Sequence, residues 1–194
     1  MNLLRSKSFD ANSYNSGDWS NRLDLSHQTN NWGVGLPPAF AGNSGNWTVM
    51  QPLLANPALN PAPTDIAQAH AVFLDWIKLR RSSPLLRLPS GAEVKSRIRF
   101  ANVGPDQVPG LVVMTIDDAS GHQLDPHARS LVAIINVAPT ARSFAMPGYA
   151  NRHLVLHPVQ ATGADPVVKT SAYALASGTV TVPARTAAVF IETR

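Results

Sequence analysis

The sequence predicts a mainly β protein, in which a C-terminal antiparallel β-sandwich follows a long irregular segment and one amphipathic helix. Residues 94–194 contain seven short apolar or alternating runs, separated by Gly, Pro, Asp and Asn clusters that are typical of turns. Residues 64–82 repeat apolar side chains at the helical period, and residues 1–63 show neither period. We therefore expect two domains, residues 1–93 and residues 94–194.

The composition is that of a globular protein. Hydrophobic residues make up 44% of the 194 residues and charged residues 14%. The absence of cysteine excludes disulfides, thiolate metal sites and cysteine nucleophiles. No P-loop, dinucleotide or zinc-ligand motif occurs, so we expect no cofactor and no metal. No apolar run approaches the length of a membrane span, and the N-terminus lacks the apolar core of a signal peptide. The compartment is left open.

The chain is basic, with a net charge of +4. Nucleic acid is the obvious partner to consider for such a chain. The basic residues are mostly scattered, and the one cluster begins at the end of the predicted helix, where cations favour the helix dipole. We interpret this cluster as a solvated face and expect no nucleic-acid partner; its members are Lys78, Arg80, Arg81, Arg87, Lys95, Arg97 and Arg99.

The irregular segment, residues 1–63, is rich in Asn, Ser, Gly and Pro and contains three of the four tryptophans, Trp19, Trp32 and Trp47. A loop of this length is usually functional or packed on another element. Exposed aromatics among amides and carboxylates are typical of carbohydrate-facing loops, because sugar rings stack on aromatic faces. The alternative is that the tryptophans only anchor the segment to a core, and the sequence leaves both readings open.

The predicted helix covers residues 64–82. Thr64 is a suitable N-cap, and Asp65 would lie in the first turn. One face is apolar, with Ile66, Phe73 and Trp76 among its members. The helix must pack against another element, and Ser83-Pro84 ends it.

The predicted strands all lie in the second half, where no second helix is convincing. Ser177-Gly178 is expected to form a hairpin turn. The strands are Val94–Phe100, Leu111–Ile116, Leu131–Val137, Ser143–Met146, Leu154–Leu156, Thr179–Val182 and Ala187–Ile191.

No pair of carboxylates has the arrangement that glycoside hydrolysis needs. Asp117 and Asp118 are adjacent at a strand end, where neighbouring side chains point to opposite faces, and we expect them to open the turn Asp118–Gly121 instead. His153 and His157 would share one strand face, but no third metal ligand is evident.

Asp18 and Arg22 form the most informative constellation. They are four residues apart and would share one face of a helical turn. One reading is a local salt bridge. The other is a carboxylate and a guanidinium that face sugar hydroxyls, with Trp19 or Asn21 beside them. Spacing alone does not choose between these readings.

Short motifs occur in order along nearly the whole chain. The first is Leu3–Ser8 (LLRSKS), followed by Ser13–Trp19 (SYNSGDW) and Asn21–Asp24 (NRLD). The later motifs are Asn31–Pro38 (NWGVGLPP), Pro52–Leu59 (PLLANPAL), Arg80–Leu85 (RRSSPL), Gly104–Gly110 (GPDQVPG), Leu156–Gln160 (LHPVQ), Asp165–Val168 (DPVV) and Val182–Phe190 (VPARTAAVF). This series resembles bacterial pullulanase-type α-1,6-glucosidases, the debranching enzymes of the α-amylase superfamily.

The resemblance implies the origin of each part. Residues 1–63 would be the loop after the eighth strand of a (β/α)8 barrel, residues 64–82 its last helix, and residues 94–194 the sandwich that follows. The family's catalytic carboxylates lie on earlier barrel strands, so the resemblance gives this chain no catalytic residue.

The resemblance also implies a role for the constellation described above. Asp18 and Arg22 would contact the sugar on the non-reducing side of the cleaved bond, with Asn21 as a neighbour. The implied partners are an α-glucan, such as pullulan or branched dextrin, and the missing catalytic barrel. The chain would then be a fragment of a debranching hydrolase and inactive alone. The alternatives are a stand-alone carbohydrate-binding or interaction module, or a subunit of a split enzyme.

Overall fold

The computed structural model describes residues 2–119 and 121–194, with the side chain of Asn15 excluded. The chain divides into two compact units, Met1–Phe73 and Leu74–Arg194, and the division lies inside the long helix α3, Pro63–Ser82. Antiparallel sheets dominate the C-terminal unit, which confirms the predicted fold class. The expected domain boundary at residue 93 separates the remnant of a barrel from the sandwich. This boundary stays a prediction.

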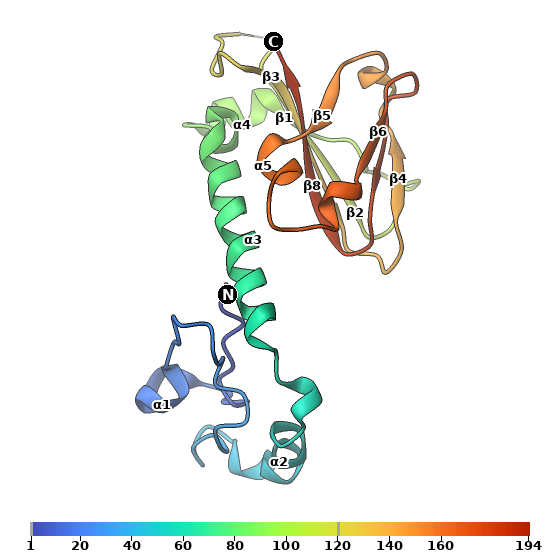
Figure 1. Ribbon diagram of the computed structural model, residues 1–194. Coiled ribbons are helices and arrows are strands. Elements are labelled where there is room, and N and C mark those ends of the chain that lie inside the picture. The colour runs from blue at the N-terminus through green and yellow to red at the C-terminus, as the bar shows by residue number, and fades with distance from the viewer. Residues whose placement is uncertain (1, 120) are drawn as a thin grey trace. The chain divides into compact units, whose positions relative to one another are not determined.

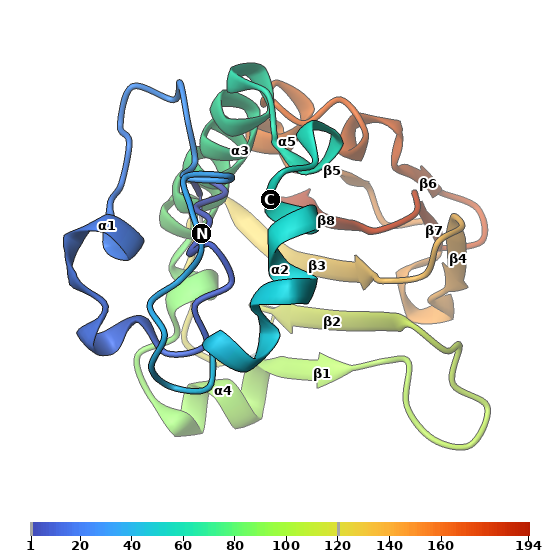
Figure 2. The ribbon, with the colours of Figure 1, turned by 90° about the horizontal axis from the view of Figure 1, so that it is seen from below.

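Two antiparallel sheets make up the C-terminal unit. The first, sheet A, has the strand order β1-β2-β3-β8-β5, and the second, sheet B, has the order β4-β7-β6. Figure 1 shows β8 beside β5 in one sheet and β4 and β6 in the other, and Figure 2 shows β1, β2 and β3 as successive neighbours. The strands are β1 Ile98–Phe100, β2 Leu111–Asp117, β3 Ala128–Asn136, β4 Arg142–Ala145, β5 Leu154–Leu156, β6 Ala172–Ala174, β7 Thr179–Val182 and β8 Thr186–Thr193.

The main core lies between the two sheets. Val113 on β2 pairs with Ile134 on β3, and both are buried. Val180 on β7 and Phe190 on β8 belong to the same cluster. Because side chains alternate along a strand, each of these inward positions is followed by one that faces the opposite side. The alternating runs in the sequence therefore correspond to real strands.

A second cluster covers the other face of sheet A. Leu79 near the end of α3 and Leu85 in the turn after it pack with Leu131 and Val189. The last turns of the helix thus pack against the sandwich of this chain, which supplies one of the elements that the apolar face was expected to need. The helix also begins one residue before the predicted N-cap Thr64, because Pro63 suits the first helical position.

The prediction of a strand over Val94–Phe100 was wrong in its first half. Residues Gly91–Arg97 form the helix α4, and only Ile98–Phe100 is a strand. Ser90 caps α4, since its hydroxyl accepts the N–H of Glu93. The pattern Ser90-x-x-Glu93 is a capping-box signature, and local side-chain capping outweighed the apolar run.

Two further short elements were missed. The helix α5, Pro158–Ala161, is capped by His157, and β6 supplies the partner of β7. Together with α4, α5 contradicts the expectation of no second helix in this half. The predicted turn at Ser177-Gly178 is confirmed, because it joins β6 to β7 and Gly178 has φ of +64°. The predicted turn Asp118–Gly121 includes Ser120, which lies outside the described residues.

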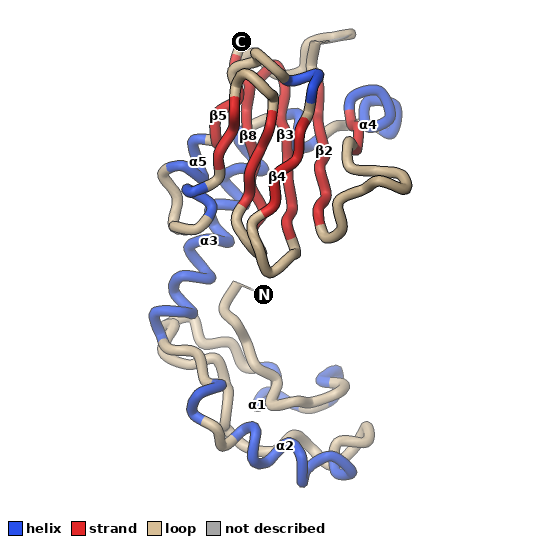
Figure 3. The backbone as a smooth tube through the Cα atoms, turned by 90° about the vertical axis from the view of Figure 1, so that its right-hand side faces the viewer, coloured by secondary structure: helices blue, strands red, loops and turns tan. Residues whose placement is uncertain are grey.

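The N-terminal unit is held by polar side chains more than by regular elements. Its helices are α1 Gly17–Asn21, α2 Trp47–Leu54 and the first part of α3, and long loops connect α1 to α2 in Figure 3. Asparagine side chains bond backbone groups across these loops: Asn30 donates to the Leu4 carbonyl at 2.7 Å and Asn31 to the Arg22 carbonyl at 2.8 Å. Hydrogen bonds from asparagine side chains to backbone carbonyls thus connect these loops, where a sheet would use backbone hydrogen bonds between strands.

Candidate functional site

The helix α1 brings the predicted sugar-contact residues together. Asp18, Trp19, Asn21 and Arg22 line one pocket of about 260 Å³ in the N-terminal unit. Gly17, with φ of +71°, turns the chain into the helix at a conformation that favours glycine. Because α1 spans little more than one turn, residues four apart lie on one side of it. The structure thus places Asp18 and Arg22 on a shared surface, as their spacing predicts.

The charged ends of Asp18 and Arg22 face solvent. Both side chains are exposed, and within the described residues neither takes part in a salt bridge. The local salt bridge, which was one of the two readings, is therefore not formed in this structure. A carboxylate that accepts and a guanidinium that only donates remain free for a ligand.

Asn21 has a different position in the site. Its side-chain amide donates to the Ser13 carbonyl at 2.8 Å and to the Gly17 carbonyl at 3.1 Å. Its own carbonyl accepts from Arg5 Nη1 at 3.1 Å. These bonds use both donors of the amide on the backbone. Asn21 therefore fixes the helix and keeps only its side-chain oxygen for a ligand.

The three tryptophans of the N-terminal unit have different surroundings: one is exposed at the pocket, and two contact other parts of the unit. Trp19 is 62% exposed and lines the pocket. Trp32 packs edge-on against Phe9, with ring centroids 5.3 Å apart. Trp47 donates its indole N–H to the Pro37 carbonyl at 3.1 Å. Trp32 and Trp47 are anchors, and Trp19 is the aromatic face that a sugar ring can reach.

Asp24 organises the turn that follows the pocket. Its carboxylate accepts the Ser26 hydroxyl at 2.6 Å, the Ser26 N–H at 2.9 Å and the Thr29 N–H at 2.9 Å. The Ser26 hydroxyl, followed by the backbone N–H groups, lowers the pKa of Asp24 to about 2. The turn therefore depends on the ionised carboxylate.

We expect this turn to persist well below the ordinary range of an aspartate. A lowered folded-state pKa means that the bonds are present above the unfolded pKa and are lost as the pH falls through about 2. An NMR titration of the Ser26 and Thr29 amides measures the midpoint. A midpoint near 3.8, the ordinary pKa of an aspartate, would show that the carboxylate does not hold the turn.

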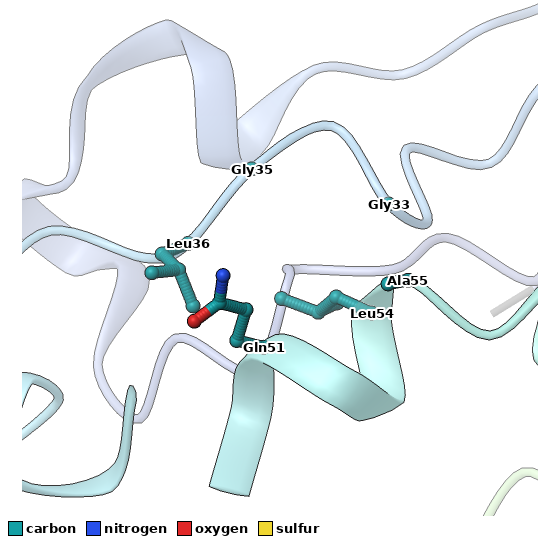
Figure 4. A pocket seen from close by; sticks show the side chains of 6 residues that line it. All are labelled: Gly33, Gly35, Leu36, Gln51, Leu54 and Ala55. Atoms are coloured by element: carbon teal, nitrogen blue, oxygen red, sulfur yellow. The ribbon is translucent and has the colours of Figure 1, made fainter. Parts of the chain in front are cut away.

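A second pocket of about 250 Å³ lies in the same unit (Figure 4). Gly33, Gly35 and Leu36 form one side, and Gln51, Leu54 and Ala55 of the α2 region form the other. The Gln51 side chain lies between those of Leu36 and Leu54 (Figure 4). The described residues that line this pocket include no titratable side chain.

The other titratable candidates have structural positions. Asp118 is buried and pairs with Arg97 and Arg194. His157 is buried and contacts the Ser82 hydroxyl at 3.0 Å, and burial lowers its pKa, whereas His153 is exposed. Among residues 2–119 and 121–194, no group of three or more side chains is arranged to hold a metal ion.

One polar pair was missed from the sequence. His27 and His70 are 43 positions apart, and their ring nitrogens Nε2 and Nδ1 lie 2.8 Å from each other. The pair links the turn after the pocket to the first part of α3. Nothing in the local sequence signals it, because the two histidines meet only in the fold.

The interpretation of the basic cluster as one solvated face was wrong, because one of its members is buried. Arg97 is buried, and its guanidinium bonds Glu93, Asp118 and the His122 carbonyl. The other cluster members that the structure describes on α3, such as Arg80 and Arg81, are exposed.

In the described part of the chain, no helix is both long and apolar enough to cross a membrane.

Comparisons with known proteins all indicate one enzyme family. The model of the C-terminal region of pullulanase-type alpha-1,6-glucosidases matches residues 27–193. Pullulanase 1, chloroplastic, of Arabidopsis thaliana is 47% identical over 197 residues, which cover 99% of this chain and 20% of that protein. The pullulanase of Klebsiella pneumoniae is 40% identical over 189 residues, covering 96% of this chain and 17% of that protein.

Solved structures agree with the sequence relatives. The crystal structure of the maltotriose complex of PulA from Klebsiella pneumoniae has a TM-score of 0.86 and 39% identity, covering 100% of this chain and 20% of that one. PulA from Klebsiella oxytoca has a TM-score of 0.86 and 38% identity, covering 100% and 18%. The chain thus spans about a fifth of the length of these relatives.

Proposed function

Because the chain belongs to the family of pullulanase-type alpha-1,6-glucosidase C-terminal regions, we propose that it works as the C-terminal section of an enzyme that hydrolyses α-1,6 branches in an α-glucan. In this proposal it supplies structural support and part of the sugar-binding site, while a catalytic barrel supplies the reacting carboxylates. The single observation that carries the sugar-binding part is the pocket that Asp18, Trp19 and Arg22 line with exposed side chains.

The chemistry of the pocket suits a glucosyl unit. Sugar hydroxyls both donate and accept, so a carboxylate at Asp18 and a guanidinium at Arg22 together satisfy them. The guanidinium is planar, always charged and offers a rigid set of donors. The exposed Trp19 ring provides an apolar face for the C–H side of the sugar. A maltotriose complex is known for the similar PulA of Klebsiella pneumoniae, which supports this ligand class.

The carboxylates of the C-terminal unit support the inactivity of the chain alone. A retaining glycosidase needs two carboxyl groups roughly 5–5.5 Å apart across the scissile bond. Glu93 is bonded to Arg97, and Glu192 is bonded to Arg152 and to Ser130. Asp118 is closed off by two arginines. These three groups are engaged in ion pairs, which supports a structural role for each of them.

The test is the release of reducing ends from pullulan by the purified 194-residue chain. The expected result is no release above the buffer blank. Release that disappears in the Asp18→Ala variant would show that this chain holds a complete active site, and the proposal would be wrong.

A second candidate function is a stand-alone carbohydrate-binding module. The exposure of Trp19 favours it, because a free aromatic ring is the usual contact of such a module with a glucan. Calorimetry of the chain with maltotriose separates the candidates. Binding tighter than about 1 mM, a contribution of about 4 kcal/mol, would favour the module. Weaker binding would favour a site that needs the barrel to be complete.

A further inference from the structure

Asn43 is a buried polar side chain of the N-terminal unit with hydrogen bonds at both its amide nitrogen and its amide oxygen. It is 0% exposed. Its amide nitrogen donates to Asp10 Oδ1 and to the Pro38 carbonyl, both at 2.9 Å, and its amide oxygen accepts the Ala11 N–H at 3.1 Å. Both donors and the acceptor are therefore used, and a buried group with such a set is costly to alter.

Asp10 is the partner that carries these bonds toward the pocket. It is 8% exposed and accepts from Asn43, from the Ser16 hydroxyl and from the Asn12 N–H, the last at 3.2 Å. Burial opposes the ionisation of Asp10, but the bonds from Ser16, Asn43 and Asn12 together outweigh it and hold the pKa below the ordinary value of 3.8. The carboxylate is thus charged at neutral pH.

The bonds continue directly into α1. Ser16 is the residue before Gly17, at which the helix begins. The Ser16 hydroxyl lies between Asp10 and the Asn12 carbonyl, which is 3.2 Å away. Asn12 in turn caps the single 3₁₀ turn Ser13–Asn15 by accepting the Tyr14 N–H. At the other end of α1, the Asn21 side-chain amide donates to the Ser13 carbonyl at 2.8 Å and so connects this end to the same turn.

We propose that Asp10 and Asn43 are positioning residues, which set the orientation of α1 and thereby place Asp18, Trp19 and Arg22 for the glucan. This inference rests on the proposed function. Neither residue lines the pocket, so both act through Ser16 and the turn that it closes. A buried, ionised anchor suits this task because it has one arrangement of donors, whereas Asp18, Trp19 and Arg22 are exposed.

The variant Asn43→Asp tests the anchor with almost no change in shape. It replaces the donor that faces Asp10 by an acceptor, so two carboxylates would meet in a buried site. Two such groups share a proton, and one pKa of the pair rises. On acidification the protonated member donates again and restores the bond. In the parent chain Asp10 stays ionised on mild acidification, because its pKa lies below the ordinary value.

The first readout is the set of ¹⁵N amide resonances of residues 17–22 in the 194-residue chain. We expect Asn43→Asp to shift them at pH 7 and mild acidification to return them toward the parent positions. The control is Asn46→Asp, at an exposed amide that donates to the Gly42 carbonyl at 3.3 Å, and it should leave them in place. Unshifted α1 resonances in Asn43→Asp, or a shift that acid does not reverse, would overturn the proposal.

The second readout is catalytic, in a chimera in which this chain replaces the matching segment of the Klebsiella pneumoniae pullulanase. We expect Asn43→Asp to lower kcat/KM for pullulan roughly 10- to 100-fold at pH 7, the scale of a misplacement of about 1 Å. The loss should shrink on acidification. If Asp18→Ala leaves kcat/KM unchanged, the proposed function fails, whereas the amide resonances still decide the positioning role. If Asp18→Ala is damaging and Asn43→Asp is not, the positioning role fails alone.

Discussion

Asp118→Ala is expected to lower the free energy of unfolding of the C-terminal unit by about 3–5 kcal/mol, the cost of removing one partner of a buried ion pair. Asp118 is 3% exposed. It accepts from Arg97 Nη1 at 2.6 Å, from Arg194 Nη2 at 2.9 Å and from the N–H groups of Leu124 and Asp125, both at 3.0 Å. Without the carboxylate, the buried guanidinium of Arg97 loses its neutralising partner at that end.

The neighbouring aspartate provides a matched control. Asp117 is 37% exposed in its side chain, and its nearest cation, Arg152, is 3.9 Å away. Asp117→Ala should cost less than about 1 kcal/mol, the scale of an exposed pair. Urea unfolding of both variants, followed by circular dichroism, measures the difference. Equal midpoints would show that the Asp118 cluster does not stabilise the sandwich.

Gly178→Ala is expected to cost about 2–5 kcal/mol, from left-handed backbone strain and overpacking together. Gly178 has φ of +64°, and a Cβ at this position would lie 2.7 Å from the backbone nitrogen of Ala150 and against the carbonyl oxygen of Met146. Both neighbours are backbone atoms, so no side chain can turn away. The hairpin between β6 and β7 would have to move as a whole.

Gly148→Ala is the control for this substitution. It lies in the adjacent turn Pro147–Tyr149, and a Cβ there would meet nothing within 4 Å. Thermal unfolding should show a clear fall in Tm for Gly178→Ala and little change for Gly148→Ala. The same Tm for the two variants would contradict the close packing of the hairpin.

Short apolar runs between turn residues were sufficient to predict most of the sandwich, because β3 and β8 are buried on both faces in their central residues and therefore read as nearly continuous apolar runs. The same pattern gave a wrong prediction where side-chain capping stabilises a helix instead of a strand. Residues Val94–Arg97 carry an apolar start, yet the Ser90 cap and the Glu93–Arg97 pair make them helical. The short strand β6 was missed because its two alanines are exposed and only Tyr173 packs against the core, so it carries no apolar run like that of β5.

The candidate site could be predicted only in part. Asp18 and Arg22 were found because they are four residues apart and occur in a motif that resembles a known family. Asp10 and Asn43 were not, since they are 33 residues apart and their bond forms only when the loop folds back. The same holds for His27 and His70. Contacts of this kind depend on tertiary structure, and no local pattern records them.

The most direct test of the central claim is kcat/KM for pullulan hydrolysis by the Klebsiella pneumoniae chimera with Asp18→Ala and, separately, with Arg22→Ala. The control variants are Asp106→Ala and Arg80→Ala, at exposed charges outside the pocket. If Asp18 and Arg22 bind the glucosyl unit as its bond is cleaved, each substitution should lower kcat/KM about 10²-fold, the scale of one lost hydrogen bond in the transition state, with unfolding midpoints unchanged. Kinetics equal to those of the controls would show that this chain contributes no sugar contact through Asp18 and Arg22, and the account would be wrong.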